Sequence, residues 1–416
     1  MNSTPMCANK AFTLAHRNLL PWLSRPKSRT YRPWRSHSKP VVRRTFSTAT
    51  LHTTHAWHPV ASAGDVPAAR SSHSVTSLSD GAVFAVFGGE DSPRHAFDAF
   101  VHLYSAESAT WRPCGDAAPS PAPLLGHAAA SVGSVLYIFG GRTGGTTCFD
   151  QEGEQMSETE TATLLSLDTA AESPTWCLCV QGDGPCVQGE SPWPSARSFH
   201  SMAALGSKLF IFGGCGEEGR LNDLWCLDTA SSEPAWVCLS AGDDTEQGPA
   251  ARGGSSLVAL PKTMYSPARL LLLFGFNGQQ MGDLWTFDLP SSTKWDDGDL
   301  ANTKWVDRTL EQVGDVPSAR SVAAVTAVGD KVFVFGGEAV PSDAGHEGAG
   351  AFTNDAFVLN PLTMTWCAVA HGDTAPPARG WAGAAQIKGE NGHAVAVWGG
   401  LDSTNTRACD GWVRDP

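Results

Sequence analysis

The stretch LFIFGG (209–214) is an apolar run that ends in a glycine pair, and the same pattern recurs along the chain. It returns as VFAVFGG (83–89), LYIFGG (136–141), VFVFGG (332–337) and VAVWGG (395–400), while LLLFGF (271–276) takes the same place with one glycine lost. The first glycines of the six copies are 52, 73, 62, 61 and 63 residues apart. An almost unbroken apolar run is typical of a strand covered on both faces, and glycine allows the positive φ of a tight turn. The pattern therefore predicts a repeat protein built from strands.

The residues that flank each copy repeat as well. A Pro-x-x-Arg motif precedes five of the copies and supplies Arg70, Arg197, Arg252, Arg320 and Arg379, whereas the second copy has Leu124 at this position. After several glycine pairs an aspartate precedes a second apolar strand, as in NDLWCLD (222–228). A tryptophan then follows, at positions 111, 176, 236, 305 and 366. This order predicts four short antiparallel strands per repeat, with the tryptophan covering the face of the neighbouring repeat.

These repeats resemble the Kelch repeat, whose period is about 50 residues. Six copies imply an all-β, six-bladed Kelch-type β-propeller over residues 55–416, because a closed ring covers the apolar face that each repeat would otherwise expose. The last copy stops after its third strand, and a spare strand with a tryptophan, HAWHPVA (55–61), precedes the first copy. We expect this N-terminal strand to complete the sixth blade and close the ring.

The composition agrees with a strand-rich protein and narrows its partners. Gly (43) and Pro (27) are frequent among the 416 residues, only 17% of residues are charged, and the formal net charge is −13. An acidic body repels nucleic acid unless it carries a local basic stripe, and the sequence shows none, so we expect no nucleic-acid partner. No apolar window of 18 residues occurs, so we expect no spanning helix and no membrane partner.

Residues 1–50 differ from the remainder of the chain. They hold ten Lys and Arg residues and no Asp or Glu, and the first acidic residue is Asp65. An Arg-rich, Ser-rich and acid-free leader is typical of an organelle transit peptide. The alternative is a basic disordered leader without a targeting role. We expect a cytoplasmic or mitochondrial protein and exclude this leader from the fold.

The cysteines and histidines do not indicate a metal centre. None of the eleven cysteines forms a C-x-x-C pair, so a structural zinc site is not expected, and their places beside strands favour packing roles. His73, His127 and His200 recur at one repeat position, which favours a structural role. A galactose-oxidase-type copper site requires two Tyr and two His, whereas Tyr104, Tyr137 and Tyr265 lie in or near apolar strands.

The segment after the fifth glycine pair departs from the repeat. It reads FGGEAVPSDAGHEGAGAF and carries Glu338, Asp343, His346 and Glu347 within ten residues. Ferrous iron accepts an open set of histidine and carboxylate ligands, so this glycine-rich loop is a candidate Fe(II) site. The alternative is an exposed polar loop with scattered acids, which is common on propeller faces.

Residues 55–416 also resemble the plant specifier proteins, the nitrile-, epithio- and thiocyanate-forming Kelch proteins that act on glucosinolate aglycones. The resemblance rests on FGGR ending at Arg142, on RSFHSM (197–202) and on an arginine on the next loop, for which Arg220 is the counterpart. It also rests on Arg-Gly-Gly (252–254), Arg-Gly-Trp (379–381) and the loop from Glu338 to Gly350.

The resemblance implies a role for several residues. Arg142 and Arg220 would hold a sulfated, anionic substrate, Phe199 and Trp381 would line the pocket, and Fe(II) would be bound by Glu338, Asp343 and His346. Arginine suits sulfate because its planar fork donates paired, charge-assisted hydrogen bonds. One departure is clear: the family spaces its three iron ligands four and four, whereas the +4 position here is Ser342 and Asp343 lies at +5.

Three functions therefore remain open at the level of sequence. The first is an Fe(II)-dependent lyase or specifier protein that acts on a small anionic compound of sulfur or nitrogen. The second is a scaffold that binds a protein partner without catalysis, since a fold alone does not fix function. The third is a structural remnant with a silent site. An enzyme requires Arg142, Trp381 and the iron loop to converge on one cavity, whereas a scaffold does not.

Overall fold

The computed structural model describes residues 56–61, 63–115, 120–143, 159–181, 193–242, 248–290, 303–343, 348–371, 374–389 and 392–415, all within one compact unit that spans Thr53–Pro416. This unit is a ring of six sheets, and its described residues contain strands and two short 3-10 turns, η1 (Ser79–Gly81) and η2 (Thr309–Glu311). No helix in the described part is long and apolar enough to cross a membrane. The basic leader lies outside the described residues, so its targeting role stays a prediction.

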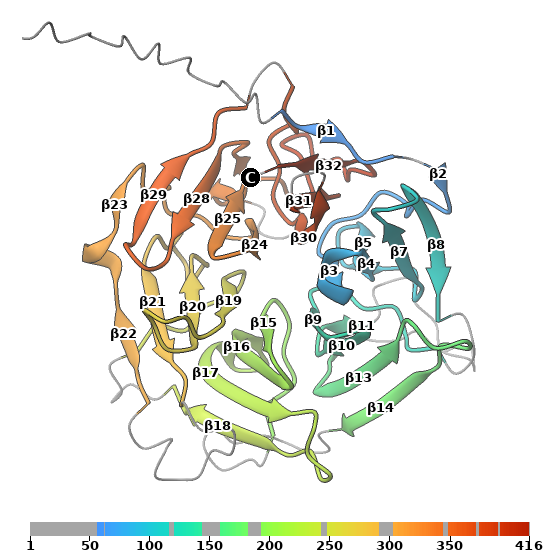
Figure 1. The fold of residues 1–416 in the computed structure, drawn as a ribbon, viewed down its shortest axis with the longest axis horizontal. Helices are drawn as coiled ribbons and strands as arrows, with labels where there is room; N and C mark the ends of the chain where they lie inside the picture. The colour runs from blue at the N-terminus through green and yellow to red at the C-terminus, as the bar shows by residue number, and fades with distance from the viewer. Residues whose placement is uncertain are drawn as a thin grey trace, which may run out of the picture. The chain divides into compact units, whose positions relative to one another are not determined.

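Each of these six sheets is one blade, and its strands lie side by side in order from the centre of the ring to its rim (Figure 1). Blade 1 contains β3 (Ser74–Leu78), β4 (Val83–Phe87), β7 (Val101–Ser105), β8 (Thr110–Cys114) and β2 (Ala63–Gly64). Blade 2 contains β9 (Ala128–Val132), β10 (Val135–Phe139), β13 (Thr163–Asp168) and β14 (Trp176–Gln181). Blade 3 contains β15 (Ser201–Leu205), β16 (Lys208–Gly216), β17 (Gly219–Asp228) and β18 (Trp236–Ser240).

The second half of the ring repeats this plan. Blade 4 contains β19 (Ser256–Leu260), β20 (Arg269–Leu273), β21 (Leu284–Asp288) and β22 (Trp305–Asp307). Blade 5 contains β24 (Ala324–Val328), β25 (Lys331–Phe335), β28 (Ala356–Asn360), β29 (Thr365–Ala368) and β23 (Val313–Gly314). Blade 6 contains β30 (Gly383–Gly389), β31 (Gly392–Trp398), β32 (Gly411–Arg414) and β1 (His58–Pro59). The six innermost strands contact one another in a closed circle.

The ring closes through the N-terminal strand, as the sequence predicts. β1 pairs antiparallel with β32, and His58 lies opposite Val413. The preceding Trp57 is 1% exposed and packs against Phe335 of blade 5, with ring centroids 5.4 Å apart. The first and last described strands of the ring therefore share one blade, so the seam is held by chain segments from both ends of the propeller.

The apolar runs form the core and the tryptophans cover it. The β4, β20 and β25 side chains are buried apart from the first residue of each strand. Trp176 of blade 2 packs on Phe87 of blade 1 with centroids 5.4 Å apart, and Trp236 of blade 3 packs on Phe139 of blade 2 at 5.5 Å. This confirms that each outer tryptophan covers the face of the preceding blade.

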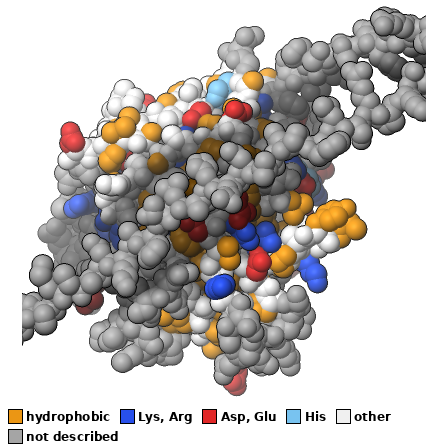
Figure 2. Space-filling view, turned by 90° about the vertical axis from the view of Figure 1, so that its left-hand side faces the viewer, with side chains coloured by type: hydrophobic (Ala, Val, Ile, Leu, Met, Phe, Trp, Pro, Cys, Tyr) orange, Lys and Arg blue, Asp and Glu red, His pale blue; other side chains and the backbone are white. Residues whose placement is uncertain are grey.

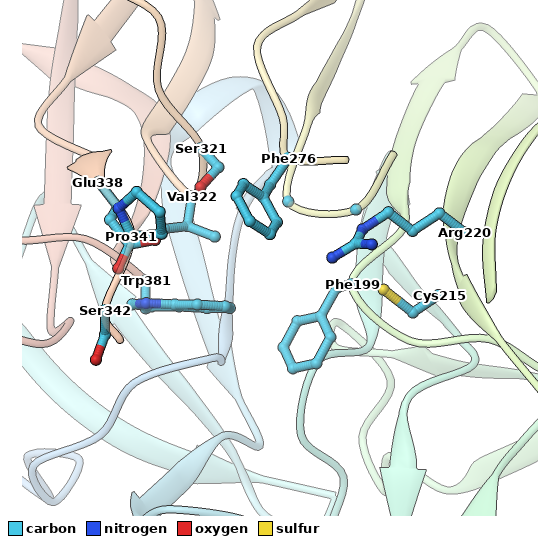
Figure 3. Close-up of a pocket in the computed structure, with 12 residues that line it drawn as sticks. Phe199, Cys215, Arg220, Phe276, Ser321, Val322, Glu338, Pro341, Ser342 and Trp381 are labelled. Atoms are coloured by element: carbon cyan, nitrogen blue, oxygen red, sulfur yellow. The ribbon is translucent and has the colours of Figure 1, made fainter. Parts of the chain in front are cut away.

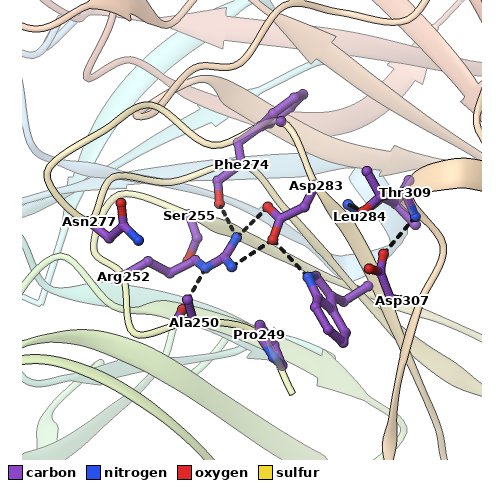
Figure 4. A network of polar contacts seen from close by, with 12 residues as sticks. Pro249, Ala250, Arg252, Ser255, Phe274, Asn277, Asp283, Leu284, Asp307 and Thr309 are labelled. Atoms are coloured by element: carbon purple, nitrogen blue, oxygen red, sulfur yellow. Dashed lines mark hydrogen bonds and ion pairs between the residues drawn. The ribbon is translucent and has the colours of Figure 1, made fainter. Parts of the chain in front are cut away.

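The Pro-x-x-Arg arginines stabilise the blades. Arg252 is fully buried, donates to the Phe274 carbonyl at 3.1 Å, and pairs with both carboxylate oxygens of Asp283 at 2.6 and 2.7 Å (Figure 4). The Trp285 indole donates to the same carboxylate at 2.7 Å. Arg197, Arg320 and Arg379 likewise pair with both oxygens of Asp223, Asp355 and Asp410, and Arg70 pairs with one oxygen of Asp98. Buried charges persist because they are paired and hydrogen-bonded.

The alignment of the fourth copy needs a correction. Gly275 has φ +117 and donates to the Arg320 carbonyl, just as Gly337 donates to the Arg379 carbonyl, so Gly275 is the second glycine of its pair. The first glycine is the one lost. Phe274 replaces it at φ +62, a conformation that favours glycine. Phe276 consequently occupies the position that directly follows the glycine pair in the other copies.

The recurring histidines are structural, whereas the packing role expected for the cysteines is wrong for five of the eight that the structure describes. Burial lowers the pKa of His73 to about 3 and of His127 to about 4, so both imidazoles are neutral near pH 7. Among the described cysteines, which form no disulfide, Cys114 and Cys226 are buried. Five others are exposed: Cys177, Cys179, Cys238, Cys367 and Cys409. Proximity to a strand did not imply burial because outer strands keep one face in solvent.

Candidate functional site

A circle of six backbone hydrogen bonds surrounds the central opening at one end of the ring. It is made by one residue per blade, two positions after the Pro-x-x-Arg site: Ser72, Gly126, Phe199, Gly254, Val322 and Trp381. Each N–H donates to the carbonyl of the preceding blade, over 2.6 to 3.2 Å. All six residues have φ between +48 and +61. We call this circle the girdle and the surface above it the mouth.

Two large girdle side chains meet across the opening. Phe199 belongs to blade 3 and Trp381 to blade 6, and their ring centroids lie 5.3 Å apart with planes at 73°. The other girdle residues are small or β-branched, so these two aromatics fill the centre. They divide the mouth into one cavity over blades 3 to 5 and a smaller one over blades 6, 1 and 2.

A second repeat position supplies the walls of the mouth. The residue after each glycine pair forms a bridge to the residue after the Pro-x-x-Arg position. The six residues are Glu90, Arg142, Cys215, Phe276, Glu338 and Leu401, and all of them line one of the two cavities. The sequence analysis selected Arg142 and Glu338 but missed the other four. The signal that would have found them is their shared offset from the glycine pair.

The larger cavity has a volume of about 100 Å³ and combines aromatic walls with two charged groups (Figure 3). Its aromatic side chains are Phe199, Phe276 and Trp381. Arg220, from β17, lies over the Phe276 ring at 5.0 Å from its centroid. Figure 3 shows Arg220 and Glu338 on opposite sides of the cavity. The Arg220 side chain is exposed, and among the described residues no ion pair holds its guanidinium.

Glu338 is a buried carboxyl group at the other side of this cavity. It is 8% exposed, and burial raises its pKa from the ordinary value of 4.5. Hydrogen bonds partly offset this effect, because its oxygens accept from the Gln280 amide at 3.3 Å and from the backbone N–H groups of Ser342 and Gly350. Glu338 therefore faces the cavity as a carboxyl group that protonates more readily than usual.

The predicted iron ligands are only partly placed. Glu338 lines the cavity, whereas Asp343 is exposed and is not among the lining residues. His346 lies outside the described residues. In the part of the chain that the structure describes, no three His, Cys, Asp or Glu side chains converge as a metal site would require. Of the three predicted ligands, Glu338 alone is shown in a position that suits an ion in the cavity.

Arg142 lies on the other side of the Phe199–Trp381 pair, which we call the aromatic divider, at the smaller cavity. Its Nε and Nη2 both donate to Glu160 Oε1, at 3.2 and 3.0 Å, and its guanidinium lies 5.6 Å from the Phe199 centroid. Glu160 comes from the hairpin of β11 (Arg142–Thr143) and β12 (Thr159–Glu160). The structure therefore brings Arg220, Phe199, Trp381 and Glu338 to one cavity, and places Arg142 at the adjoining one in an ion pair. The convergence expected of an enzyme is thus met by Trp381 and Glu338 but not by Arg142.

The carboxylate of Glu90, which lines the smaller cavity, is also paired. Glu90 Oε1 accepts from the hydroxyls of Ser71 and Ser72 at 3.1 and 3.0 Å, and its carboxylate lies 3.5 Å from the Arg407 guanidinium. Glu90 belongs to the hairpin of β5 (Glu90–Ser92) and β6 (His95–Ala96), and Glu338 begins the equivalent hairpin of β26 (Glu338–Val340) and β27 (Ala351–Phe352). The same offset thus carries a paired carboxylate in blade 1 and a cavity-facing carboxyl group in blade 5.

Comparison with known proteins agrees with this architecture. The family model described as the KLHDC2/KLHL20/DRC7 Kelch-repeats domain matches residues 35–181 and 153–337. A Thlaspi arvense protein named N-(sulfonatooxy)prop-2-enimidothioate sulfolyase is 29% identical over 359 residues, which cover 83% of this chain and 92% of that protein. Human host cell factor 1 is 26% identical over 320 residues, which cover 73% of this chain but 14% of that protein. The chain thus resembles a plant specifier-type protein over most of both proteins, whereas its match to the host cell factor covers most of this chain but a small part of the host cell factor.

Proposed function

The chain belongs to the Kelch-repeat family, and from this premise we propose that its mouth is the active site of a specifier-like lyase. Its substrate is a small anionic compound of sulfur or nitrogen, such as a glucosinolate aglycone or an analogue. The anionic group binds Arg220, and the apolar remainder lies against Phe199, Phe276 and Trp381.

One observation carries this proposal: the exposed guanidinium of Arg220, which lies over the Phe276 ring, borders an aromatic cavity. A cation beside an apolar cavity attracts an anion, and the planar guanidinium forms paired hydrogen bonds with sulfate or carboxylate oxygens. The cavity, at about 100 Å³, has room for a few ligand atoms below the rim. Larger substituents would extend past Arg220, which is itself exposed.

The similarity to the Thlaspi protein supports the class of substrate. The name of that protein describes a lyase that acts on an imidothioate with a sulfonatooxy group. Such a compound carries a sulfate ester, which Arg220 is suited to hold, beside a hydrocarbon group, which suits the aromatic walls. Arg220 would stabilise the charge that develops on the sulfate oxygens as sulfate departs.

We also propose Fe(II) as a cofactor, bound by Glu338 together with Asp343 and His346 of the following loop. Glu338 fits this role because its carboxyl group faces the cavity. When bound, a ferrous ion would supply a Lewis acid for a substrate sulfur or nitrogen. The protein's own part is to hold the anion at Arg220 on the opposite side of the cavity and to keep water from the apolar walls.

Calorimetric titration of the full-length protein with benzenesulfonate tests the anion site. Arg220→Gln should weaken binding about tenfold or more, because a hydrogen-bonded charge is lost. Arg112→Gln is the matched control: this arginine lies on β8, at the outer edge of blade 1, and should leave affinity unchanged. Equal affinity of Arg220→Gln and the wild type would contradict the proposal. Incubation with an N-sulfonatooxy imidothioate, followed by sulfate measurement, then tests the reaction.

A second candidate function is protein binding, and one surface feature favours it. Met264 and Tyr265 are 86% and 78% exposed in the loop between β19 and β20. The Thr263 hydroxyl accepts from the N–H groups of Tyr265 and Ser266, so this turn is held in place. Elsewhere the side of the propeller in Figure 2 shows basic and acidic side chains intermixed. If the protein binds neither benzenesulfonate nor Fe(II), protein binding remains as the candidate function.

A further inference from the structure

The two arginines that the sequence assigns to anion binding differ in their surroundings. Among the described residues no ion pair holds the Arg220 guanidinium, whereas Arg142 shares Glu160 Oε1 between two of its nitrogens. The pair is mostly shielded from solvent, with side-chain exposures of 23% and 14%. A guanidinium already held by a carboxylate gains little from a second anion, because the local charge is neutralised.

Glu160 is held firmly in this position. It lies directly opposite Arg142 in the β11–β12 hairpin, and the Thr143 and Thr159 hydroxyls are 3.1 Å apart in the next register position. The Ser198 hydroxyl of blade 3 also donates to Glu160 Oε1 at 2.8 Å. Three donors therefore converge on one carboxylate oxygen, two from Arg142 and one from the neighbouring blade.

Both arginines and Glu160 act on the same wall of the larger cavity. The Cys215 thiol lines this cavity, and burial raises its pKa. The positive charges of Arg220 and Arg142 lower the pKa of this thiol, and the negative charge of Glu160 raises it. Cys215 thus senses all three charges, so a change at Glu160 alters the potential in the cavity as well as at Arg142.

We propose that Glu160 determines the charge selectivity of the mouth: by pairing with Arg142 it leaves Arg220 as the anion-binding group and limits the group held at Arg220 to a single negative charge. This deepens the proposed function and rests on its anion cavity. Arg142 then acts as a positioning residue, which lies over Phe199 and orients the aromatic divider. Without the Glu160 charge, the positive charge of Arg142 on the far side of Phe199 would add to that of Arg220, which favours a dianionic group.

Titrations of the full-length protein with benzenesulfonate, a monoanion, and phenyl phosphate, largely a dianion above pH 7, test this selectivity. Glu160→Gln keeps an acceptor oxygen and removes the charge, so phenyl phosphate should bind about tenfold tighter relative to benzenesulfonate. Ser198→Ala is the matched control, because it removes one contact of Glu160 and leaves its charge. Arg142→Gln should leave benzenesulfonate affinity within about twofold, whereas Arg220→Gln should not.

Two outcomes would overturn the proposal: unchanged selectivity in Glu160→Gln, or an Arg142→Gln loss as large as that of Arg220→Gln. If the wild type binds neither probe, the anion site of the proposed function fails, and a ligand-free measurement decides the role of Glu160. Peptide-resolved alkylation of Cys215 by iodoacetamide at pH 8 should be faster in Glu160→Gln, because the thiol pKa falls. An unchanged rate would then reject the effect of Glu160 on the cavity.

Discussion

The two halves of the mouth are built on the same frame and differ in whether their charges are paired. Over blades 6, 1 and 2, Glu90 and Arg142 are each bound by partners of opposite charge. Over blades 3 to 5, Arg220 and Glu338 face each other across an aromatic cavity. Glu90 and Glu338 occupy the same repeat offset. The comparison teaches that a repeat places a side chain, while its neighbours decide whether that side chain is structural or available to a ligand.

The largest effect is expected where the halves are alike, in the buried arginines below the mouth. Arg252→Leu leaves Asp283 without its charge partner, and Arg70→Leu leaves Asp98 with the His102 imidazole as its remaining partner. Each should destabilise the protein by about 3 kcal/mol, since breaking a buried pair strands a charge. Thermal unfolding followed by circular dichroism measures this. If one of the two variants unfolds at the same temperature as the wild type, the two halves do not share one frame. Arg112→Gln is the control, and its unfolding temperature should not change.

A smaller effect is expected at the two equivalent carboxylates. Under anaerobic conditions, Glu338→Gln should weaken Fe(II) binding by the full-length protein about tenfold or more, because the proposed ligand is lost. Glu90→Gln is the matched control, since its carboxylate is held by Ser71, Ser72 and Arg407. Equal binding by wild type and Glu338→Gln would remove iron from the proposal. An equal loss in both variants would show that iron does not distinguish the halves.

The smallest effect is a difference in pH dependence. Burial raises the pKa of Glu338 above 4.5, so its protonated form is favoured in the folded protein. The free energy that protonated Glu338 adds to folding is fully present below pH 4.5 and is lost as the pH rises through the raised pKa. With a chelator present, Glu338→Gln should therefore gain stability relative to the wild type between pH 4.5 and 7. Denaturant titrations at several pH values measure the gap, and a gap that stays constant or narrows would contradict this environment for Glu338.

Much of the fold follows from the sequence because its signals are local and repeated. The glycine pairs, the arginines that precede them and the later tryptophans fix the strand order within each blade, and six copies with a spare N-terminal strand predict a closed ring. The loss of a glycine from LLLFGF was assigned one position too late. The sequence does not show which of the two glycine positions is lost in this copy. The positive φ of Phe274 shows that it is the first one.

The candidate site was predictable in part. Phe199, Trp381, Arg220 and Glu338 meet at one cavity, as their motifs suggested, and the offset after the glycine pair would have added Cys215 and Phe276. The ion pair of Arg142 with Glu160 was not predictable, because 17 residues separate them in the chain and only the β11–β12 register brings them together. The sequence by itself therefore determined the repeat, the ring and the residues at its mouth, since these depend on period and residue type. The tertiary structure decided which charges are paired, because pairing depends on distances between residues of different strands and blades.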